Sequence, residues 1–419
     1  MRNPSGPKVI LIIDYPFATR DAGRLGLSVI QDAGIQVAVW DLSYFFRPKA
    51  SELFIEAPSG VDLTVCSSTA QLSSLCSTLT SQHVVIFVGC LNPVQAWRYL
   101  KALSMISATP ARLTSVAPGH VPIPILNSVT QDPRSSYLSR AFSLLTNPHR
   151  WERIPKRLAS SIFLTTITIQ RKFHLSCPIR PLEHIWAGST VSGIGRWYVD
   201  ASTKVTYIHS LDYDLVIASR ASGKQSPSRV VFIDSMGPLH PEYFLEETPP
   251  CLISPQTYSE IVCKGLDQIE KRLETEVIIA AHPRATVGVM EPWYQGRRVL
   301  YGQTPELIAG ATAVILAHGS TSIGMAVVHQ RPIVLLGSSQ FDPIVQYYAE
   351  GFAQALDMQI IDLDAPELPP FTLDVNEETY AQFVHKYVKR QGTPEEPFWS
   401  VVASEIISDT KPPDGKKAD

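Results

Sequence analysis

The sequence predicts an α/β protein with two Rossmann-like, doubly wound domains that face each other across a cleft. Its 419 residues are enough for two domains of ordinary size and a large buried core. Short apolar runs alternate with helical segments in both halves of the chain, as in parallel sheets covered by helices. Several of these runs end in Asp, His, Ser or Gly, which is typical of strands whose carboxyl ends form a ligand site.

The first domain is expected over residues 1–205, after a short flexible lead. Its first strand, 8–14, is an apolar run that ends in Asp14. The loop after this strand has two glycines but no G-x-G-x-x-G, so the dinucleotide fingerprint is missing and an NAD enzyme is disfavoured. Further strands and the helices between them are expected at 24–33, 36–42, 62–66, 69–79, 83–89 and 93–106.

Composition narrows the classes of function. The net charge is −3, so no global positive field points to nucleic acid. The six cysteines are scattered, none forms a C-x-x-C pair, and they are expected to be reduced thiols. No signal peptide opens the sequence and no apolar run reaches the length of a membrane span, so a cytoplasmic protein is expected.

Residues 149–180 form a basic stretch in which Glu152 is the only acid. A basic stretch with a bulky apolar component can lie on an anionic membrane surface, here as a peripheral contact with the inner membrane. The alternative is a solvated helix that crosses between the domains and extends its cations into water. We favour the second interpretation.

The second domain is expected over residues 206–395. A helix at 396–409 is expected to follow and to pack back on the first domain, and a tail at 410–419 is expected to be disordered. Near the start of this domain, Asp212 and Asp214 have the spacing of a strand and would share one face. Such a pair forms either a ligand site or, more often, a solvated turn.

The first of two loops that define the predicted site is His282-Pro283-Arg284, which follows a strand at 277–281. Pro283 restricts His282 to an extended conformation, so its imidazole is expected to project from the tip of the strand. A second His-Pro pair begins at His240. It follows a loop rather than a strand, so we rank it lower.

The second loop runs from His318 to Ser322, after a strand at 313–317 and before an expected helix. Gly319 permits a tight turn, and the Ser and Thr hydroxyls can cap a helix. A helix N-terminus also presents free N–H groups and partial positive charge, which suits a phosphate. Ordinary capping is the alternative, but the two loops together predict a pocket for a phosphorylated, nucleotide-linked ligand.

These segments resemble a known family. The motifs are Ile-Ala-Ala-His-Pro-Arg (279–284), Leu-Ala-His-Gly-Ser-Thr-Ser-Ile-Gly-Met-Ala (316–326) and Pro-Ile-Val-Leu-Leu (332–336). They resemble bacterial surface-polysaccharide glycosyltransferases, in particular the sialyltransferase, polysialyltransferase and capsule Kdo-transferase group. The resemblance covers roughly Val230–Gly337. It implies the GT-B architecture and metal-independent, inverting transfer from a CMP-activated acidic sugar to a glycan or lipid-linked acceptor, with no cofactor beyond the nucleotide-sugar donor.

The resemblance also implies roles by position. His282 would contact the donor phosphate or act as an acid towards the leaving CMP, and Arg284 would pair with a donor carboxylate or phosphate. The same phosphate would be bound by the hydroxyls and backbone N–H groups of one loop, made of His318, Gly319, Ser320, Thr321 and Ser322.

Two carboxylates compete for the role of base towards the acceptor hydroxyl. Asp14 and Asp234 each end a predicted strand, one in each domain. Asp14 lies on the side that usually supplies the base in a GT-B enzyme. Asp234 lies where the family has an acidic motif, although Ser235 replaces the second acid of that motif. The choice stays open. No carboxylate or His set has metal-ligand spacing, so metal independence is expected.

Three other functions compete with glycosyl transfer. A nucleotide-sugar epimerase of the same architecture would convert its substrate without an acceptor. A polyol-phosphate transferase, as in teichoic-acid-type polymerases, would use CDP-glycerol and also carries His-Pro and Ser-rich motifs. A non-catalytic module of a polysaccharide-assembly complex would bind nucleotide without turnover.

Overall fold

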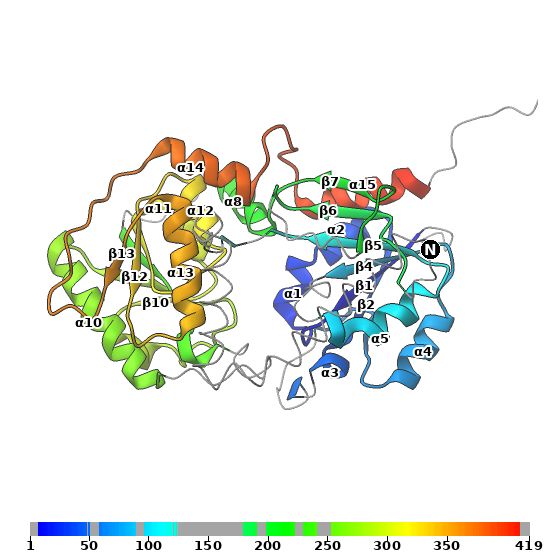
Figure 1. Ribbon diagram of the computed structural model, residues 1–419, viewed down its shortest axis with the longest axis horizontal. Helices are drawn as coiled ribbons and strands as arrows, with labels where there is room; N and C mark the ends of the chain where they lie inside the picture. Colours follow the sequence, from blue (N-terminus) through cyan, green and yellow to red (C-terminus); the bar gives the residue numbers. More distant parts are fainter. Residues whose placement is uncertain are drawn as a thin grey trace, which may run out of the picture.

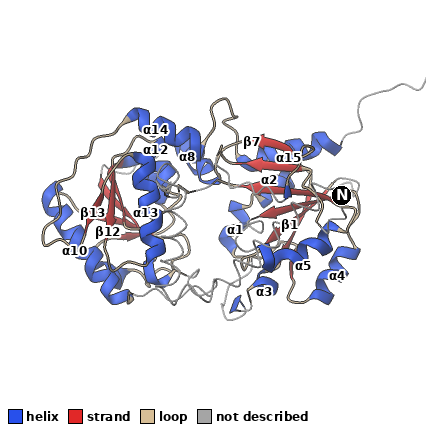
Figure 2. Cartoon of the chain, in the orientation of Figure 1, coloured by secondary structure: helices blue, strands red, loops and turns tan. Residues whose placement is uncertain are grey.

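The computed structural model describes residues 7–47, 49–50, 58–88, 96–119, 121–122, 124, 179–190, 198–222, 229–240 and 253–410. They form two lobes, each with a parallel sheet and covering helices (Figure 1 and Figure 2). Most of the basic stretch at 149–180 lies outside the described residues, as does the tail at 411–419.

The first lobe is built on a sheet whose described strands have the order β3-β2-β1-β4-β5-β6-β7, and each neighbouring pair is parallel. The side chains of β1 alternate between two apolar cores. Ile10 and Ile12 enter one core, and Val9, Leu11 and Ile13 enter the other. Burial on both faces explains why β1 is a continuous apolar run. The strands are β1 (Lys8–Ile13), β2 (Gln36–Asp41), β3 (Leu63–Val65), β4 (His83–Val88), β5 (Arg112–Ala117), β6 (His184–Ala187) and β7 (Lys204–Tyr207).

Short helices cover this sheet, and α1 lies on the side that faces the second lobe (Figure 1). Ser68 starts α4, because its side chain accepts a hydrogen bond from the backbone N–H of Gln71 at 3.3 Å. The helices are α1 (Thr19–Arg24), α2 (Leu27–Asp32), α3 (Ser43–Phe46), α4 (Thr69–Ser77) and α5 (Ala96–Ser107).

The described strands of the second sheet have the order β10-β9-β8-β11-β12-β13 and are parallel. In β8, Ile233 pairs with Ala280 of β9 and with Leu316 of β11. The loops that follow these three residues therefore leave the sheet side by side. The strands are β8 (Arg229–Ile233), β9 (Val277–Ala280), β10 (Val299–Leu300), β11 (Ala311–Leu316), β12 (Ile333–Gly337) and β13 (Ile360–Asp362).

Helices flank the second sheet as well (Figure 2). The α-helices are α8 (Leu211–Ser222), α10 (Pro255–Leu273), α11 (Thr304–Gly310), α12 (Ile323–Val328), α13 (Pro343–Leu356) and α14 (Glu377–Phe383). The described part of the lobe also contains the 3₁₀ turns η6 (Gly237–Leu239) and η7 (Glu291–Tyr294) and the π-helical turn η8 (Val384–Val388).

The strand spacing of Asp212 and Asp214 was misleading, because both residues lie in the first turn of α8. Leu211, Tyr213, Val216 and Ser219 are buried, which fits a helical face rather than a strand. Carboxylates are favoured at this position because the first turn of a helix carries unsatisfied N–H groups and partial positive charge.

The final helix, α15 (Phe398–Thr410), returns to the first lobe and packs against α2 (Figure 1). Two indole N–H groups fix it there. Trp399 donates to the carbonyl oxygen of Arg24 at 2.9 Å, and Trp186 of β6 donates to Glu405 at 2.7 Å. The helix thus braces the end of α1, which is the segment that faces the second lobe.

Candidate functional site

Asp234 follows β8 and is buried, with 1% of its surface exposed. Its Oδ1 accepts hydrogen bonds from the Tyr294 hydroxyl at 2.6 Å and from the Met236 N–H at 2.7 Å. Its Oδ2 lies 3.5 Å from the backbone N–H of His282. Burial raises the pKa of Asp234, although these hydrogen bonds oppose the rise. The carboxylate therefore ties the loop after β8 to the loop after β9.

Asp14 has a matching environment in the first lobe. Its Oδ2 accepts hydrogen bonds from the Tyr99 hydroxyl at 2.6 Å and from the Arg47 guanidinium at 3.2 Å, and its exposed fraction is 3%. Both carboxylates that the sequence suggested as bases thus serve inside their own lobes. Because each is buried and already accepts several hydrogen bonds, the geometry does not place either against an incoming hydroxyl.

His282 leaves the end of β9 and is partly exposed. Its Nδ1 accepts a hydrogen bond from the backbone N–H of Arg284 at 3.1 Å, so the proton of the neutral ring lies on Nε2. Burial lowers the pKa of His282 to about 3, and electrostatic interactions with Arg284, Arg20, His318 and Arg24 lower it further. Near neutral pH, His282 is therefore an uncharged hydrogen-bond donor at Nε2.

His318 has the opposite tautomer. Its Nδ1 lies 2.8 Å from the carbonyl oxygen of Gly319, which can only accept, so Nδ1 carries the proton and Nε2 carries the lone pair. Burial lowers the pKa of His318 as well. Gly319 does not adopt a positive φ, so the loop does not use the left-handed conformation that glycine favours. An added Cβ there would lie 2.7 Å from Cβ of Tyr348, so glycine is needed for close packing.

The three hydroxyl side chains of the loop before α12 differ in whether they form hydrogen bonds within the loop. The Ser320 Oγ accepts a hydrogen bond from the backbone N–H of Ser322 at 3.2 Å and so shapes the loop itself. Ser322 is the N-cap of α12, but its side chain makes no capping hydrogen bond. Thr321 is exposed and lines a cavity between the lobes. Of the three, Thr321 is the hydroxyl best placed for a ligand.

His240, which the sequence analysis ranked lower, lies directly against His282. The two ring centroids are 5.0 Å apart, with the rings at 78° in an edge-to-face arrangement. Burial lowers the pKa of His240 to about 3, with further contributions from His282, Arg284, His318 and Arg20. The 3₁₀ turn η6 brings His240 back beside the tip of β9, which a ranking by strand ends did not anticipate. The repeated His-Pro pair was its only signal in the sequence.

The first lobe supplies cations to the site that no sequence motif indicated. Arg20 and Arg24 lie on α1, and their charges act on the pKa of His282 in the other lobe. Tyr15 also bridges the lobes: its ring contacts the guanidinium of Arg47 at 4.1 Å and that of Arg284 at 5.3 Å, measured to the ring centroid. These residues follow the tip of β1, so the loop after β1 and the loop after β9 meet.

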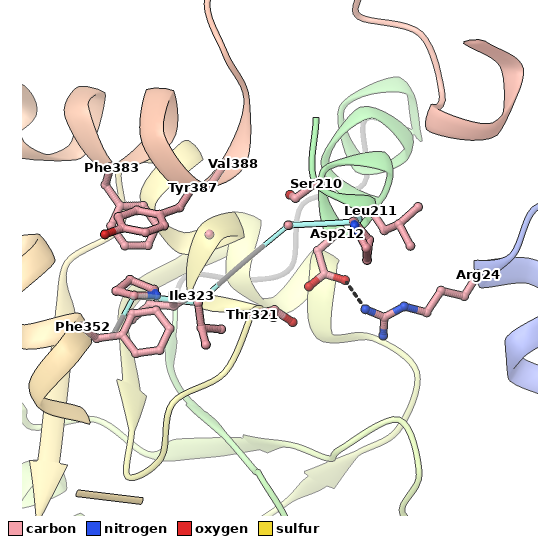
Figure 3. A pocket seen from close by; sticks show the side chains of 15 residues that line it. Arg24, Ser210, Leu211, Asp212, Thr321, Ile323, Phe352, Phe383, Tyr387 and Val388 are labelled. Carbon is pink, nitrogen blue, oxygen red and sulfur yellow. Dashed lines mark ion pairs between the residues drawn. The ribbon is translucent and has the colours of Figure 1, made fainter. Parts of the chain in front are cut away.

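A cavity of about 80 Å³ lies beside these loops. Figure 3 shows aromatic side chains at one end of it and the ion pair of Arg24 with Asp212 at the other, at 3.5 Å. Thr321 lies between them. The cavity is far smaller than the roughly 300–1,000 Å³ of sites that enclose a whole drug-sized ligand.

Within the described residues, no three His, Cys, Asp or Glu side chains are grouped as a metal site would need. None of the described helices combines the length and the apolar character required to cross a bilayer.

Comparisons with known proteins gave matches only at the level of structure. No protein-family model matches the chain, and no curated protein matches it. Solved structures similar to it include the spinosyn forosaminyltransferase SpnP, with 15% identity, a TM-score of 0.40, and coverage of 97% of this chain and 95% of that one. The glycosyltransferase SnogD from Streptomyces nogalater shows 8% identity, a TM-score of 0.44, and coverage of 96% and 99%. For MurG from Acinetobacter baumannii the identity is 11%, the TM-score 0.42, and the coverage 96% and 99%.

Proposed function

We propose that this protein is a glycosyltransferase that moves a sugar from a nucleotide-activated donor to a hydroxyl of a glycan or lipid-linked acceptor. One observation carries the proposal. Imidazole and guanidinium groups from both lobes act on one another at the tips of β8, β9 and β11, with His282 at their centre. The carboxyl ends of parallel strands are where open α/β sheets bind their ligands.

The second lobe would hold the phosphate of the donor. His282 donates from Nε2, Arg284 supplies a fixed positive charge, and Thr321 supplies a hydroxyl. Breaking the sugar–phosphate bond leaves negative charge on the phosphate oxygens. Hydrogen-bond donors and cations already aimed at that charge lower the barrier, because they need no reorganisation during the reaction. A neutral imidazole serves here as a donor, as its lowered pKa requires.

The acceptor would enter from the side of the first lobe, where Arg20, Arg24 and Tyr15 face the gap. Its hydroxyl must lose a proton as the new bond forms. We propose that the lone pair on Nε2 of His318 accepts this proton, because His318 is partly exposed whereas Asp14 and Asp234 are buried and hydrogen-bonded inside their lobes. The lowered pKa of His318 keeps that lone pair available at neutral pH.

The finer assignment, an inverting transfer from a CMP-linked acidic sugar, rests on the resemblance of the His282 and His318 loops to bacterial surface-polysaccharide glycosyltransferases. The cationic surroundings of His282 are compatible with a donor that carries a carboxylate besides its phosphate. The resemblance is also the basis for expecting no metal ion in the reaction.

The direct test is incubation with CMP-N-acetylneuraminate, CMP-Kdo or CDP-glycerol, each with and without oligosaccharide acceptors, followed by chromatography of the nucleotide. Glycosyl transfer predicts acceptor-dependent release of CMP. Conversion of a nucleotide sugar without acceptor would indicate an epimerase. Turnover of CDP-glycerol, with no turnover of either CMP-sugar, would indicate a polyol-phosphate transferase. Nucleotide binding with no turnover in any mixture would reject the transferase proposal in favour of a binding module.

A further inference from the structure

Two segments that link the lobes meet at His209. The first link, residues 208–210, connects β7 of the first lobe to α8 of the second, and the second link, residues 389–397, leads from η8 back to α15 (Figure 1). His209 and Lys389 form an isolated antiparallel bridge between the two links. Beside this bridge, the Ser210 N–H donates to the carbonyl oxygen of Val388 at 2.7 Å. The contacts of His209 therefore lie where the two lobes are joined.

The imidazole of His209 faces a carbonyl oxygen with each of its two nitrogens. Nδ1 lies 3.0 Å from the carbonyl oxygen of Ser210, and Nε2 lies 2.8 Å from the carbonyl oxygen of Glu396. A carbonyl oxygen only accepts hydrogen bonds, and a neutral imidazole has a single N–H. Both contacts are hydrogen bonds only if the ring carries two protons. The geometry therefore requires the imidazolium form of His209.

A carboxylate accompanies this charge. His209 is completely buried, with 0% of its surface exposed, and a buried charge is costly unless it is paired. Oδ1 of Asp214 lies 3.6 Å from Nε2 of His209, and the same oxygen accepts the Phe398 N–H at 2.9 Å. Burial raises the pKa of Asp214, whereas the hydrogen bond from Phe398 and the interaction with His209 lower it. Asp212, on the same turn of α8, pairs instead with Arg24 at 3.5 Å.

The other titratable groups around the ring are engaged with one another. The Tyr213 ring lies against His209, with 5.0 Å between the ring centroids. Its hydroxyl donates to Glu395 at 3.0 Å and lies 3.4 Å from the guanidinium of Arg220. On the second link, the Lys389 ammonium lies 3.4 Å from the Glu395 carboxylate. Lys389 and Glu395 thus pair with each other rather than with the imidazole.

We propose that His209 is a pH-responsive pin between the lobes. As an imidazolium, it is fixed on the first link by the hydrogen bond from Nδ1 to Ser210, and it holds the second link by the hydrogen bond from Nε2 to Glu396. Loss of one proton at higher pH leaves a lone pair facing a carbonyl oxygen and removes the charge beside Asp214. The two links then separate more readily, and site residues from different lobes lose their fixed spacing.

The protonation state is measured by ¹⁵N NMR of the full-length protein with labelled histidine rings. At pH 6, both ring nitrogens of His209 should have the chemical shifts of N–H groups. His184 is the matched comparison, because it is also buried, at 1% exposed, but burial lowers its pKa to about 4. It should therefore show one protonated and one unprotonated nitrogen. His209→Gln and His184→Gln assign the two sets of signals, and a neutral ring at His209 would overturn the proposal.

The effect on the links is measured by hydrogen exchange of single backbone amides. Ser210 and Phe398 report on the two links, since their N–H groups donate to Val388 and Asp214. After correction for the intrinsic exchange rate, their protection should fall about tenfold between pH 6 and pH 8.5, the effect of losing one hydrogen bond from a charged group. The amide of Val314, which donates to a carbonyl oxygen within the second sheet, should keep its protection.

His209→Gln removes the titratable group, so the corrected protection of Ser210 and Phe398 should no longer change with pH. The same pH dependence in His209→Gln and in the unmodified protein would overturn the proposal. Asp214→Asn is a second variant, which keeps an acceptor for the Phe398 N–H and removes the negative charge beside the ring. It should move the fall in protection to lower pH, and an unmoved profile would also overturn the proposal. Neither measurement needs turnover or bound nucleotide, so a failure of the proposed function leaves both unaffected.

Discussion

The hydroxyl of Tyr294 lies 2.6 Å from Oδ1 of Asp234, where it caps the tip of β8. The first lobe repeats the arrangement with Tyr99 and Asp14, also at 2.6 Å, at the tip of β1. In both lobes a buried carboxylate at the end of a central strand is held by a tyrosine distant in sequence. These pairs fix the loops that carry the candidate site rather than present a base to a substrate.

Replacing Tyr294 with Phe is expected to lower the free energy of unfolding by about 2 kcal/mol, because a buried acceptor loses its hydroxyl donor. Urea denaturation at pH 7 measures this change. Tyr301→Phe is the matched control, since the Tyr301 hydroxyl donates to Glu291 at 2.8 Å nearer the surface and its loss should matter less. Equal effects of the two substitutions would show that the Asp234 contact is not specially stabilising.

Asp234 also predicts a pH dependence. Burial raises its folded-state pKa, so the folded protein holds this proton more tightly than the unfolded chain. Its contribution to stability should therefore decline as pH rises above about 3.9, the value in an unfolded chain. Asp234→Asn should flatten the pH dependence of unfolding above that value. An unchanged profile would contradict the assignment.

The site histidines predict the opposite slope. The pKa values of His240 and His282 are lowered to about 3, whereas the unfolded value is about 6.5. Between these values the unfolded chain binds more protons, so stability should fall as pH drops from 6.5 towards 3. His240→Phe should make this decline shallower in urea titrations between pH 7 and 4.5. A decline of the same steepness in His240→Phe and in the unmodified protein would contradict the lowered pKa of His240.

Gly26 predicts a backbone effect where α15 meets the first lobe. It has a φ of +57°, and an added Cβ would collide with the indole of Trp399. Gly34 has a φ of +84° but open space around it, so Gly34→Ala reports the conformational cost alone, about 1 kcal/mol. Gly26→Ala should lower the melting temperature clearly more than Gly34→Ala does. Equal shifts would mean that Trp399 does not pack as described.

Arg284 predicts a loss of ligand affinity rather than of stability. Arg284→Gln should weaken CMP binding about tenfold or more, because a charge-assisted contact with phosphate is lost, and it should reduce the dependence of binding on salt. Arg272→Gln is the control: its guanidinium lies 5.0 Å from the Phe371 ring centroid and outside the described site. Similar Kd values for the two variants would remove Arg284 from the proposed site.

The sequence predicted the sheets better than the site. Continuous apolar runs such as those of β1 and β9 identified buried parallel strands, since both faces of these strands are covered. Residues directly after such strands, including His282 and His318, could be proposed as site residues because neighbouring strand tips lie close together in space. Local patterns contain this information.

The remaining features depend on contacts between distant segments. Tyr294 and Asp234 are 60 positions apart, and Tyr99 and Asp14 are 85 apart, so nothing local links them. Arg24 acts on His282 across the two lobes, and its backbone carbonyl is held by Trp399 of α15. Asp212 was assigned to a strand because an i, i+2 pair of acids also fits the first turn of a helix. The Tyr–Asp pairs, the position of Arg24 and the conformation at Asp212 all depend on packing between segments that are distant in the sequence.

The central claim is that His282 donates a hydrogen bond from Nε2 to the phosphate of a nucleotide. Thermal-shift measurements with CMP, CDP, UDP and GDP test it most directly, because a ligand at a hundredfold excess over Kd stabilises the folded state by about 2.7 kcal/mol. We expect CMP to raise the melting temperature of the unmodified protein. His282→Gln, which keeps an N–H near the position of Nε2, should retain part of this shift, and His282→Phe should lose it. No response to any of the four nucleotides, or equal responses in the unmodified protein and His282→Phe, would contradict the account.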